Sequence, residues 1–129
     1  MRVLARCLSI LLLACLLCTV VASAQCSGIT APVPFSKEIL TISTTAIPLT
    51  QAKYQTGGYV ATMAVVTLEG GDVRYEVVGT PTATDGHYIP ATPLTTFSLC
   101  GIDTIRAFKA IRMVGDVRAI ITYYRSKTP

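Results

Sequence analysis

The sequence predicts an all-β protein, a small antiparallel β-sandwich or jelly-roll-like domain. Its apolar runs are short and rich in Val, Ile, Thr and Tyr, which suit a pleated, half-buried surface. Turn signals containing Gly or Pro separate about seven such runs. The longest run, over residues 58–79, contains Gly70 and Gly71. Because glycine adopts positive φ without a Cβ clash, this pair predicts a two-residue hairpin turn between two strands.

A second hairpin is predicted near the C-terminus, with Gly115 and Asp116 as its turn. Helical periodicity over 103–113 is the alternative for its first half. The proline at Pro48 belongs on a sheet edge or in a turn, because it cannot donate to a ladder. In chain order the predicted elements are an extended arm over 25–37, a strand over 38–45, the hairpin within 58–79, an irregular segment over 80–93, a strand over 94–99, and strands over 105–114 and 117–124.

The N-terminus has the three-part layout of a secretory signal peptide. Two early arginines precede an apolar run over 7–21, and a small-x-small cleavage site ends at Ala24. An apolar run of about 15 residues is shorter than the ~20 that a spanning helix needs, so no stable membrane span is expected. We therefore expect a cleaved signal peptide over 1–24, a single mature domain over 25–129, and export to the periplasm or the medium.

The cysteines divide between these two parts. Three of the five lie within 1–24, which leaves Cys26 and Cys100 in the mature chain. A pair of cysteines in an exported domain favours one disulfide. Two free thiols or an intermolecular bridge are the alternatives, because the sequence does not show whether the two Cβ atoms meet.

The charge balance argues against a nucleic-acid partner. Removing two arginines takes Lys plus Arg from 11 to 9 against 7 acids, so the mature net charge is +2. That excess is too small for an electrostatic nucleic-acid footprint. The sequence also contains no phosphate loop, dinucleotide fingerprint, Cys-x-x-Cys pair or metal-binding helix motif, and no cofactor is expected.

The only histidine, His87, stands in the irregular segment between Asp85 and Tyr88. Histidine titrates near neutral pH, so an acid-base or metal site is one interpretation. A structural zinc site needs about four ligands, and no nucleophile context accompanies this histidine. No metal site is therefore expected, and a turn-fixing histidine is the other interpretation.

A strand that precedes this segment carries Arg74 and Tyr75. Arg74 and Glu76 share one face of that strand, beside Asp72, as either a solvated charged face or half of an acid-base pair. Tyrosines suit both packing and ligand platforms because each has an apolar body and a polar tip. The candidate residues for ligand or partner binding are Arg74, Tyr75, Asp85, His87 and Tyr88, and none is assigned a catalytic role.

Three stretches resemble a known class of proteins. They are DVRYEVVGTPTATDGH over 72–87, FKAIRMV over 108–114 and ITYY over 121–124. Together they are similar to small structural proteins of tailed phages and prophages, and the resemblance covers about residues 59–124. It implies a β-sandwich in a virion that assembles through contacts with other subunits, here with a secretory signal peptide added.

The function expected from the sequence is therefore non-enzymatic. The first hypothesis is an exported structural or assembly subunit that associates with itself or with a protein partner. The second is an exported module that binds a glycan or another cell-surface ligand through the 80–93 segment and nearby tyrosines. A small hydrolase or inhibitor that uses His87 is a further alternative.

Overall fold

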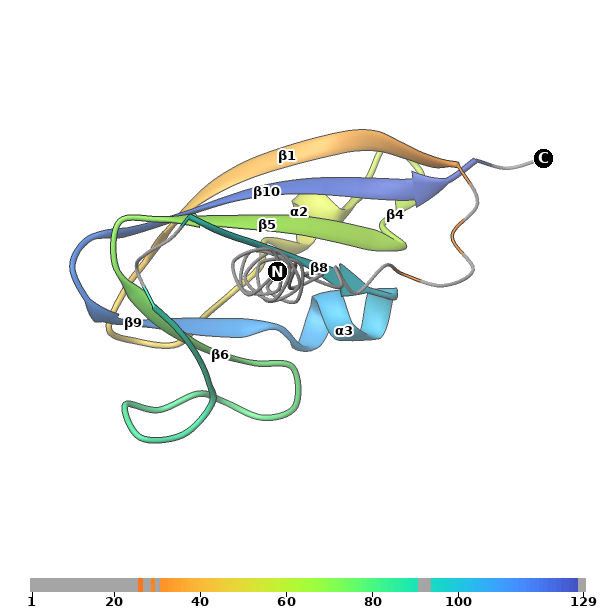
Figure 1. The fold of residues 1–129 in the computed structure, drawn as a ribbon. Coiled ribbons are helices and arrows are strands. Elements are labelled where there is room, and N and C mark those ends of the chain that lie inside the picture. The colour runs from red at the N-terminus through yellow and green to blue at the C-terminus, as the bar shows by residue number, and fades with distance from the viewer. Residues whose placement is uncertain (1–25, 27–28, 30, 91–93, 128–129) are drawn as a thin grey trace, which may run out of the picture.

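The computed structural model describes residues 26, 29, 31–90 and 94–127, so the predicted signal peptide lies outside the described residues. It confirms the all-β prediction: two antiparallel four-stranded sheets face each other as a small sandwich (Figure 1). We call them sheet A and sheet B.

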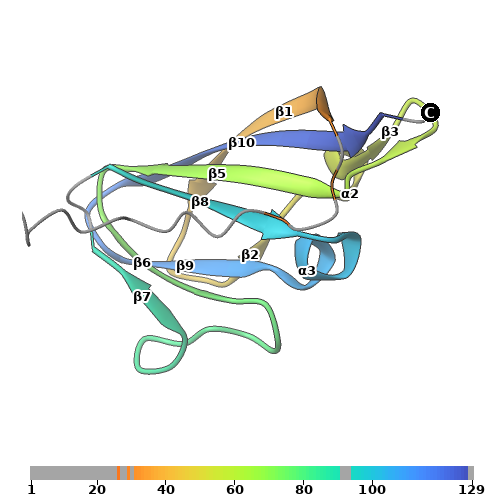
Figure 2. The same ribbon diagram turned by 45° about the vertical axis from the view of Figure 1, so that its right-hand side comes forward.

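Sheet A has the strand order β1-β10-β5-β8, with every neighbouring pair antiparallel. Its strands are β1 (Pro32–Ile42), β10 (Val117–Ser126), β5 (Met63–Glu69) and β8 (Thr95–Cys100). Sheet B has the order β2-β9-β6-β7, with β7 at one edge (Figure 2). Its strands are β2 (Ile47–Pro48), β9 (Lys109–Val114), β6 (Asp72–Glu76) and β7 (His87–Ile89). The prediction that Pro48 lies at an edge is confirmed.

Numbered from first to eighth along the chain, the strands of the two sheets run 1-8-3-6 and 2-7-4-5. This is the order of a jelly roll, in which antiparallel strand pairs wrap around one core. Three small elements complete the described fold: α2 (Gln51–Tyr54), the ribbon of β3 (Gln55–Thr56) with β4 (Tyr59–Val60), and α3 (Ile102–Ala107).

Both predicted hairpins are wrong. β5 pairs with β10 and β8, whereas β6 pairs with β9 and β7, so the chain changes sheets at Gly70 and Gly71. In the same way β9 belongs to sheet B and β10 to sheet A, and the chain crosses between them at Gly115 and Asp116. These are bends in strands that pass from one sheet to the other, as at the corners of a β-sandwich.

The two bends lie against each other, and this explains their glycines. A Cβ on Gly71 would stand 1.8 Å from the carbonyl oxygen of Val114, and one on Gly70 would stand 1.9 Å from that of Asp116. Gly70 also has a φ of 103°. Glycine is therefore required here by the close approach of two chain segments as well as by backbone conformation.

The strand predicted over 105–114 begins too early. Residues 102–107 form α3, and only β9 is a strand. Ile105 is fully buried while Ile102 packs partly against the core, which is the i, i+3 spacing of a helix face. The helical alternative therefore holds for the first half of this segment.

The core lies between the two sheets and follows the alternation of each strand. In β5 the buried side chains are Ala64, Val66 and Leu68, and in β10 they include Ile121 and Tyr123. An aromatic cluster joins the sheets: Tyr75 of β6 stacks on Phe97 and Phe108 at ring-centroid distances of 5.1 and 5.7 Å.

Candidate functional site

Strands β6 and β7 bring four of the five candidate residues together. Their antiparallel register places Arg74 opposite Tyr88 and Tyr75 opposite His87. Because neighbouring residues of a strand point to opposite faces, the first pair lies on the outer face of sheet B and the second pair faces inward.

The outer pair is held by a network that includes Asp72. The Tyr88 hydroxyl donates to Asp72 Oδ2 at 2.5 Å, and the Arg74 guanidinium lies 5.5 Å from the centroid of the Tyr88 ring. Arg74 also donates to the carbonyl oxygen of Gly86 at 2.7 Å. The hydrogen bond to Asp72 is the main reason that the pKa of Tyr88 is raised. An aromatic ring that is 51% exposed thus stands between an acid and a guanidinium.

The inner pair serves packing. Tyr75 belongs to the aromatic cluster of the core, and the His87 ring lies 5.1 Å from its ring centroid. Burial raises the pKa of Tyr75, and the negative charge of Glu76 adds to the effect. The partly buried Tyr75 ring, packed against the ring of the exposed His87, helps to hold β7 against β6.

Asp85 shapes the turn that leads into β7. Its amide donates to Thr82 Oγ1 at 3.0 Å, its carbonyl oxygen accepts from the Thr82 amide at 3.0 Å, and its carboxylate accepts from the Gly86 amide at 3.0 Å. This turn presents the Gly86 carbonyl to Arg74. Asp85 is therefore a support for the cluster formed by Asp72, Arg74 and Tyr88, which we call the Tyr88 cluster.

The Tyr88 cluster has the chemistry of a binding site. Among the described residues no group of three or more His, Cys, Asp and Glu side chains converges to hold a metal ion. An exposed ring supplies apolar contact, while the guanidinium and the carboxylate beside it supply a hydrogen-bond donor and an acceptor.

Asp72 is the member of this cluster that the sequence analysis left out of the candidate set. It lies 16 residues from Tyr88 along the chain, so only the pairing of β6 with β7 shows that they meet. Asp72 stands beside Arg74 in the sequence, and that proximity was the only signal available without the register.

A second feature is a groove along β1. Four consecutive residues of this strand, Lys37 to Leu40, line it together with Thr50 and Lys53. A smaller hollow adjoins it at Lys37 and is lined by Pro34, Phe35, Ser36 and Thr122. Since Lys37 and Ile39 point outward while Glu38 and Leu40 point inward, the groove runs along the edge of the strand and not over one face.

Glu38 is a buried acid beneath this groove. The Tyr123 hydroxyl donates to Glu38 Oε1, and the Thr50 amide donates to the same oxygen at 3.2 Å. Burial first, and then this hydrogen bond, raise the pKa of Tyr123 far above its ordinary value. Both groups are thus satisfied inside the core, as buried polar groups must be.

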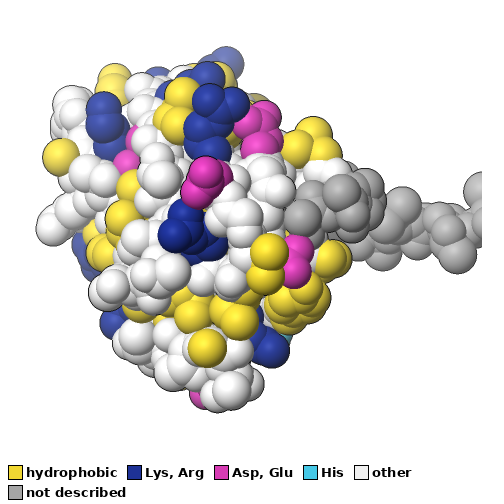
Figure 3. Space-filling model, turned by 90° about the vertical axis from the view of Figure 1, so that its left-hand side faces the viewer, with side chains coloured by type: hydrophobic (Ala, Val, Ile, Leu, Met, Phe, Trp, Pro, Cys, Tyr) yellow, Lys and Arg dark blue, Asp and Glu magenta, His cyan; other side chains and the backbone are white. Residues whose placement is uncertain are grey.

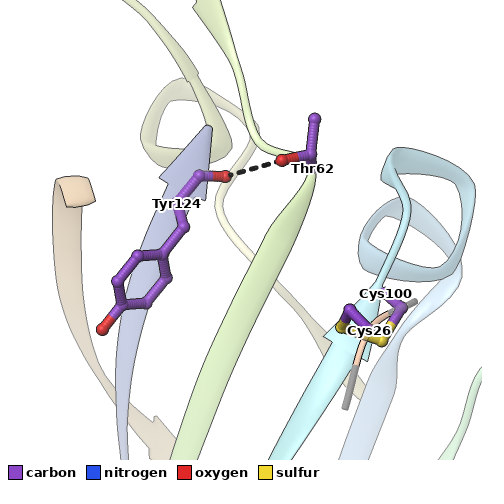
Figure 4. The surroundings of a disulfide bond; sticks show 4 residues. All are labelled: Cys26, Thr62, Cys100 and Tyr124. Carbon is purple, nitrogen blue, oxygen red and sulfur yellow. Dashed lines mark hydrogen bonds between the residues drawn. A yellow bond between two sulfur atoms is a disulfide. The ribbon is translucent and has the colours of Figure 1, made fainter. Parts of the chain in front are cut away.

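The predicted disulfide is confirmed. Cys26 and Cys100 are bonded with a Cα–Cα distance of 5.4 Å, which ties the N-terminal arm to the end of β8 (Figure 4). Beside it, the Thr62 hydroxyl donates to the carbonyl oxygen of Tyr124 at 3.4 Å. The disulfide therefore lies at the end of sheet A where β5 begins and β8 ends, since Met63 pairs with Cys100.

Some of the surface arginines form ion pairs with acids. Arg118 donates to Glu69 at 2.6 Å and Arg112 donates to Asp116 at 2.7 Å. Figure 3 looks onto the end of the molecule where the strands change sheets, and there the two signs of charge lie side by side among hydrophobic side chains. This face has no single-sign field of the kind that attracts nucleic acid.

None of the described helices is long and apolar enough to cross a membrane. No known protein family, curated protein or solved structure matches this chain.

Proposed function

We propose that this chain is an exported, non-enzymatic jelly roll that works through surface contacts, as a structural or assembly subunit that associates with itself or with a protein partner. The observation that carries the proposal is the outer face of sheet A. Jelly rolls occur in both viral capsids and lectins, so by analogy the fold suits assembly and leaves glycan binding as the second candidate.

The outer face of sheet A is nearly uncharged along the register of its four strands. One row across the sheet is Ile39, Ile120, Thr67 and Thr96. The next row is Lys37, Thr122, Val65 and Ser98. An ion pair between Arg118 and Glu69 lies at one end of the face. A sheet face that meets only water usually carries many charged side chains, whereas these two rows carry one, Lys37. This composition favours contact with another surface.

The proposal of export rests on the N-terminal sequence and on the disulfide. A signal-peptide layout over 1–24 would send the chain into an oxidising compartment, where a disulfide such as Cys26–Cys100 persists. The resemblance to phage structural proteins supports a virion as the site of assembly.

The test is the mass of the mature chain, residues 25–129, measured by light scattering over a range of concentrations in oxidising and reducing buffer. The expected result is a defined oligomer that survives reductant, because the disulfide lies within one chain. A protein that stays monomeric at every concentration overturns self-assembly. Capture of a protein partner from the native source would then be the remaining support for a subunit role.

The second candidate is a glycan-binding module, favoured by the exposed Tyr88 ring between Arg74 and Asp72. Tyr88→Ala should abolish binding on a glycan array, since the ring supplies the stacking surface. Tyr59→Ala is the matched control, because Tyr59 is 46% exposed and lies on β4, outside the Tyr88 cluster. Absence of binding by the unchanged protein, or equal loss in both variants, rejects this candidate.

A further inference from the structure

The edge strands of the sandwich differ greatly in how well they could pair with a strand of another chain. β2 has 2 residues and includes Pro48, and β7 has 3 residues and is followed by Pro90. β8 has 6 residues and ends at Cys100, which is bonded to Cys26. β1 has 11 residues and pairs only with β10 among the described strands. It is the longest of the four described sheet edges.

The groove described above runs along this same edge. It exposes outward and inward residues of β1 in succession, from Lys37 to Leu40, which is what a strand lying beside β1 would contact. Thr50 and Lys53 also line it. Ile39 lies at the centre of the groove and is 57% exposed. An exposed isoleucine is unusual on an edge strand.

The usable part of β1 is limited at both ends. A register shift between Pro34 and Ser36 interrupts the ladder, and the strand ends at Ile42. Proline cannot donate a hydrogen bond, so pairing before this irregularity is also disfavoured. The regular stretch is therefore 36–42, and its central residue is Ile39.

Charge and overlap together select one antiparallel register for two copies of this stretch: an axis at Leu40 opposes no like charges but pairs only 38–42, whereas an axis at Ile39 pairs all of 36–42. Inward residues must face inward residues, so the twofold axis has to pass through a residue and not between two. An axis at Lys37 places two lysines opposite each other, and an axis at Glu38 brings two buried carboxyl groups together, both of which are destabilising. An axis at Ile39 places Lys37 opposite Thr41, Glu38 opposite Leu40, and Ile39 opposite its own copy.

We propose that two copies of this chain pair through β1 in antiparallel orientation, centred on Ile39. Their two four-stranded A sheets then join into one continuous eight-stranded sheet, and the nearly uncharged outer faces become a single surface twice as wide. This inference rests on the proposed function and specifies its partner as a second copy of the chain.

Cysteine cross-linking of the oxidised mature chain tests the register. In the proposed pair the two Ile39 Cα atoms lie ~4.5–5.5 Å apart, within disulfide reach. The Thr41 Cα atoms are offset by four residues along the strand, or ~14 Å, which is too far for a bond. Ile39→Cys should therefore form a covalent dimer under mild oxidation, joined through the two introduced thiols as peptide mapping would show, whereas Thr41→Cys should not. Equal cross-linking of both variants, or of neither, overturns the register.

A second variant separates this inference from the proposed function. Ile39→Lys places two lysines opposite each other and should raise the dimer dissociation constant at least tenfold. Val114→Lys is the matched control, since Val114 is 65% exposed but lies on β9. If the unchanged protein is an oligomer and Ile39→Lys leaves its mass the same, association uses another surface and the β1 inference fails alone. If the unchanged protein is a monomer, self-assembly fails with it.

Discussion

Among single residues, Tyr123 and Glu38 are those at which we expect a small chemical change to lower the free energy of unfolding most. Their hydrogen bond links β10 to β1 inside the core, and the tyrosine has no exposed surface. A buried acid that loses its donor keeps the cost of burial without the compensating bond. We therefore expect Tyr123→Phe to lower the free energy of unfolding by about 1–3 kcal/mol at neutral pH.

The same contact predicts how stability depends on pH. Because the pKa of Tyr123 is raised above its ordinary value of 10.0 in the folded state, the unfolded chain loses this proton first as pH rises. The stabilisation is thus complete below pH 10 and is lost above it. Urea unfolding of the unchanged protein between pH 8 and 11 should show this decline, and Tyr123→Phe should make it shallower, leaving the part that comes from Tyr75 and Tyr88, whose pKa values are also raised. Tyr124→Phe, on the opposite face of the same strand, should leave the decline intact; a flat profile in the unchanged protein would contradict the prediction.

The Tyr88 cluster shows what sequence could indicate about a site and what it could not. His87 and Tyr88 were singled out because a lone histidine and a tyrosine stood in a long irregular segment. Their separation into an inward and an outward residue, and the bond to Asp72, depend on the pairing of β6 with β7. Nothing local encodes that register, since β7 is only 3 residues long.

At the scale of elements, the strands were more predictable than their partners. Alternating β-branched residues located β5, β6, β8 and β10, because that alternation comes from one buried face. The Gly70-Gly71 and Gly115-Asp116 pairs predict hairpin turns wrongly, because a tight turn and a bend between sheets both need glycine. For α3 the sequence leaves helix and strand open, because its residues include β-branched Ile and Thr and the helix has only 6 residues.

The bend at Gly71 gives a test of this element. Gly71→Ala should destabilise the protein by about 1–3 kcal/mol or prevent folding, because the new Cβ meets the Val114 carbonyl oxygen. Gly79→Ala is the matched control: Gly79 has a φ of 98° but open space around it, so it should cost only ~1–2 kcal/mol from backbone strain. Thermal unfolding of both variants measures the difference. A smaller loss at Gly71 than at Gly79 would show that the two bends separate without cost.

Across the whole molecule, the disulfide is the largest single constraint on the unfolded chain. Its cysteines are 74 residues apart, and closing a loop of that length is worth roughly 4 kcal/mol in the chain-entropy description. We expect the double variant Cys26→Ser, Cys100→Ser to lose about 2–4 kcal/mol of unfolding free energy in urea. Reductant should lower the stability of the unchanged protein by the same amount and have no effect on the variant. A variant as stable as the oxidised protein would mean that the arm contributes nothing to the fold.

The pairing of β1 with β10 also sets the order in which this molecule can be built. The earliest of the described strands finds its only partner in the latest one, with contacts such as Glu38 opposite Ile121. While the chain is being synthesised, β1 has no strand to pair with on either edge until residues 117–126 are available. Folding dominated by such distant pairings is slow, on the order of milliseconds to seconds. A chain whose first strand pairs with its last cannot complete sheet A early and so stays unfolded for longer. A chain cut short before β10 leaves β1 and β5 without the strand that lies between them.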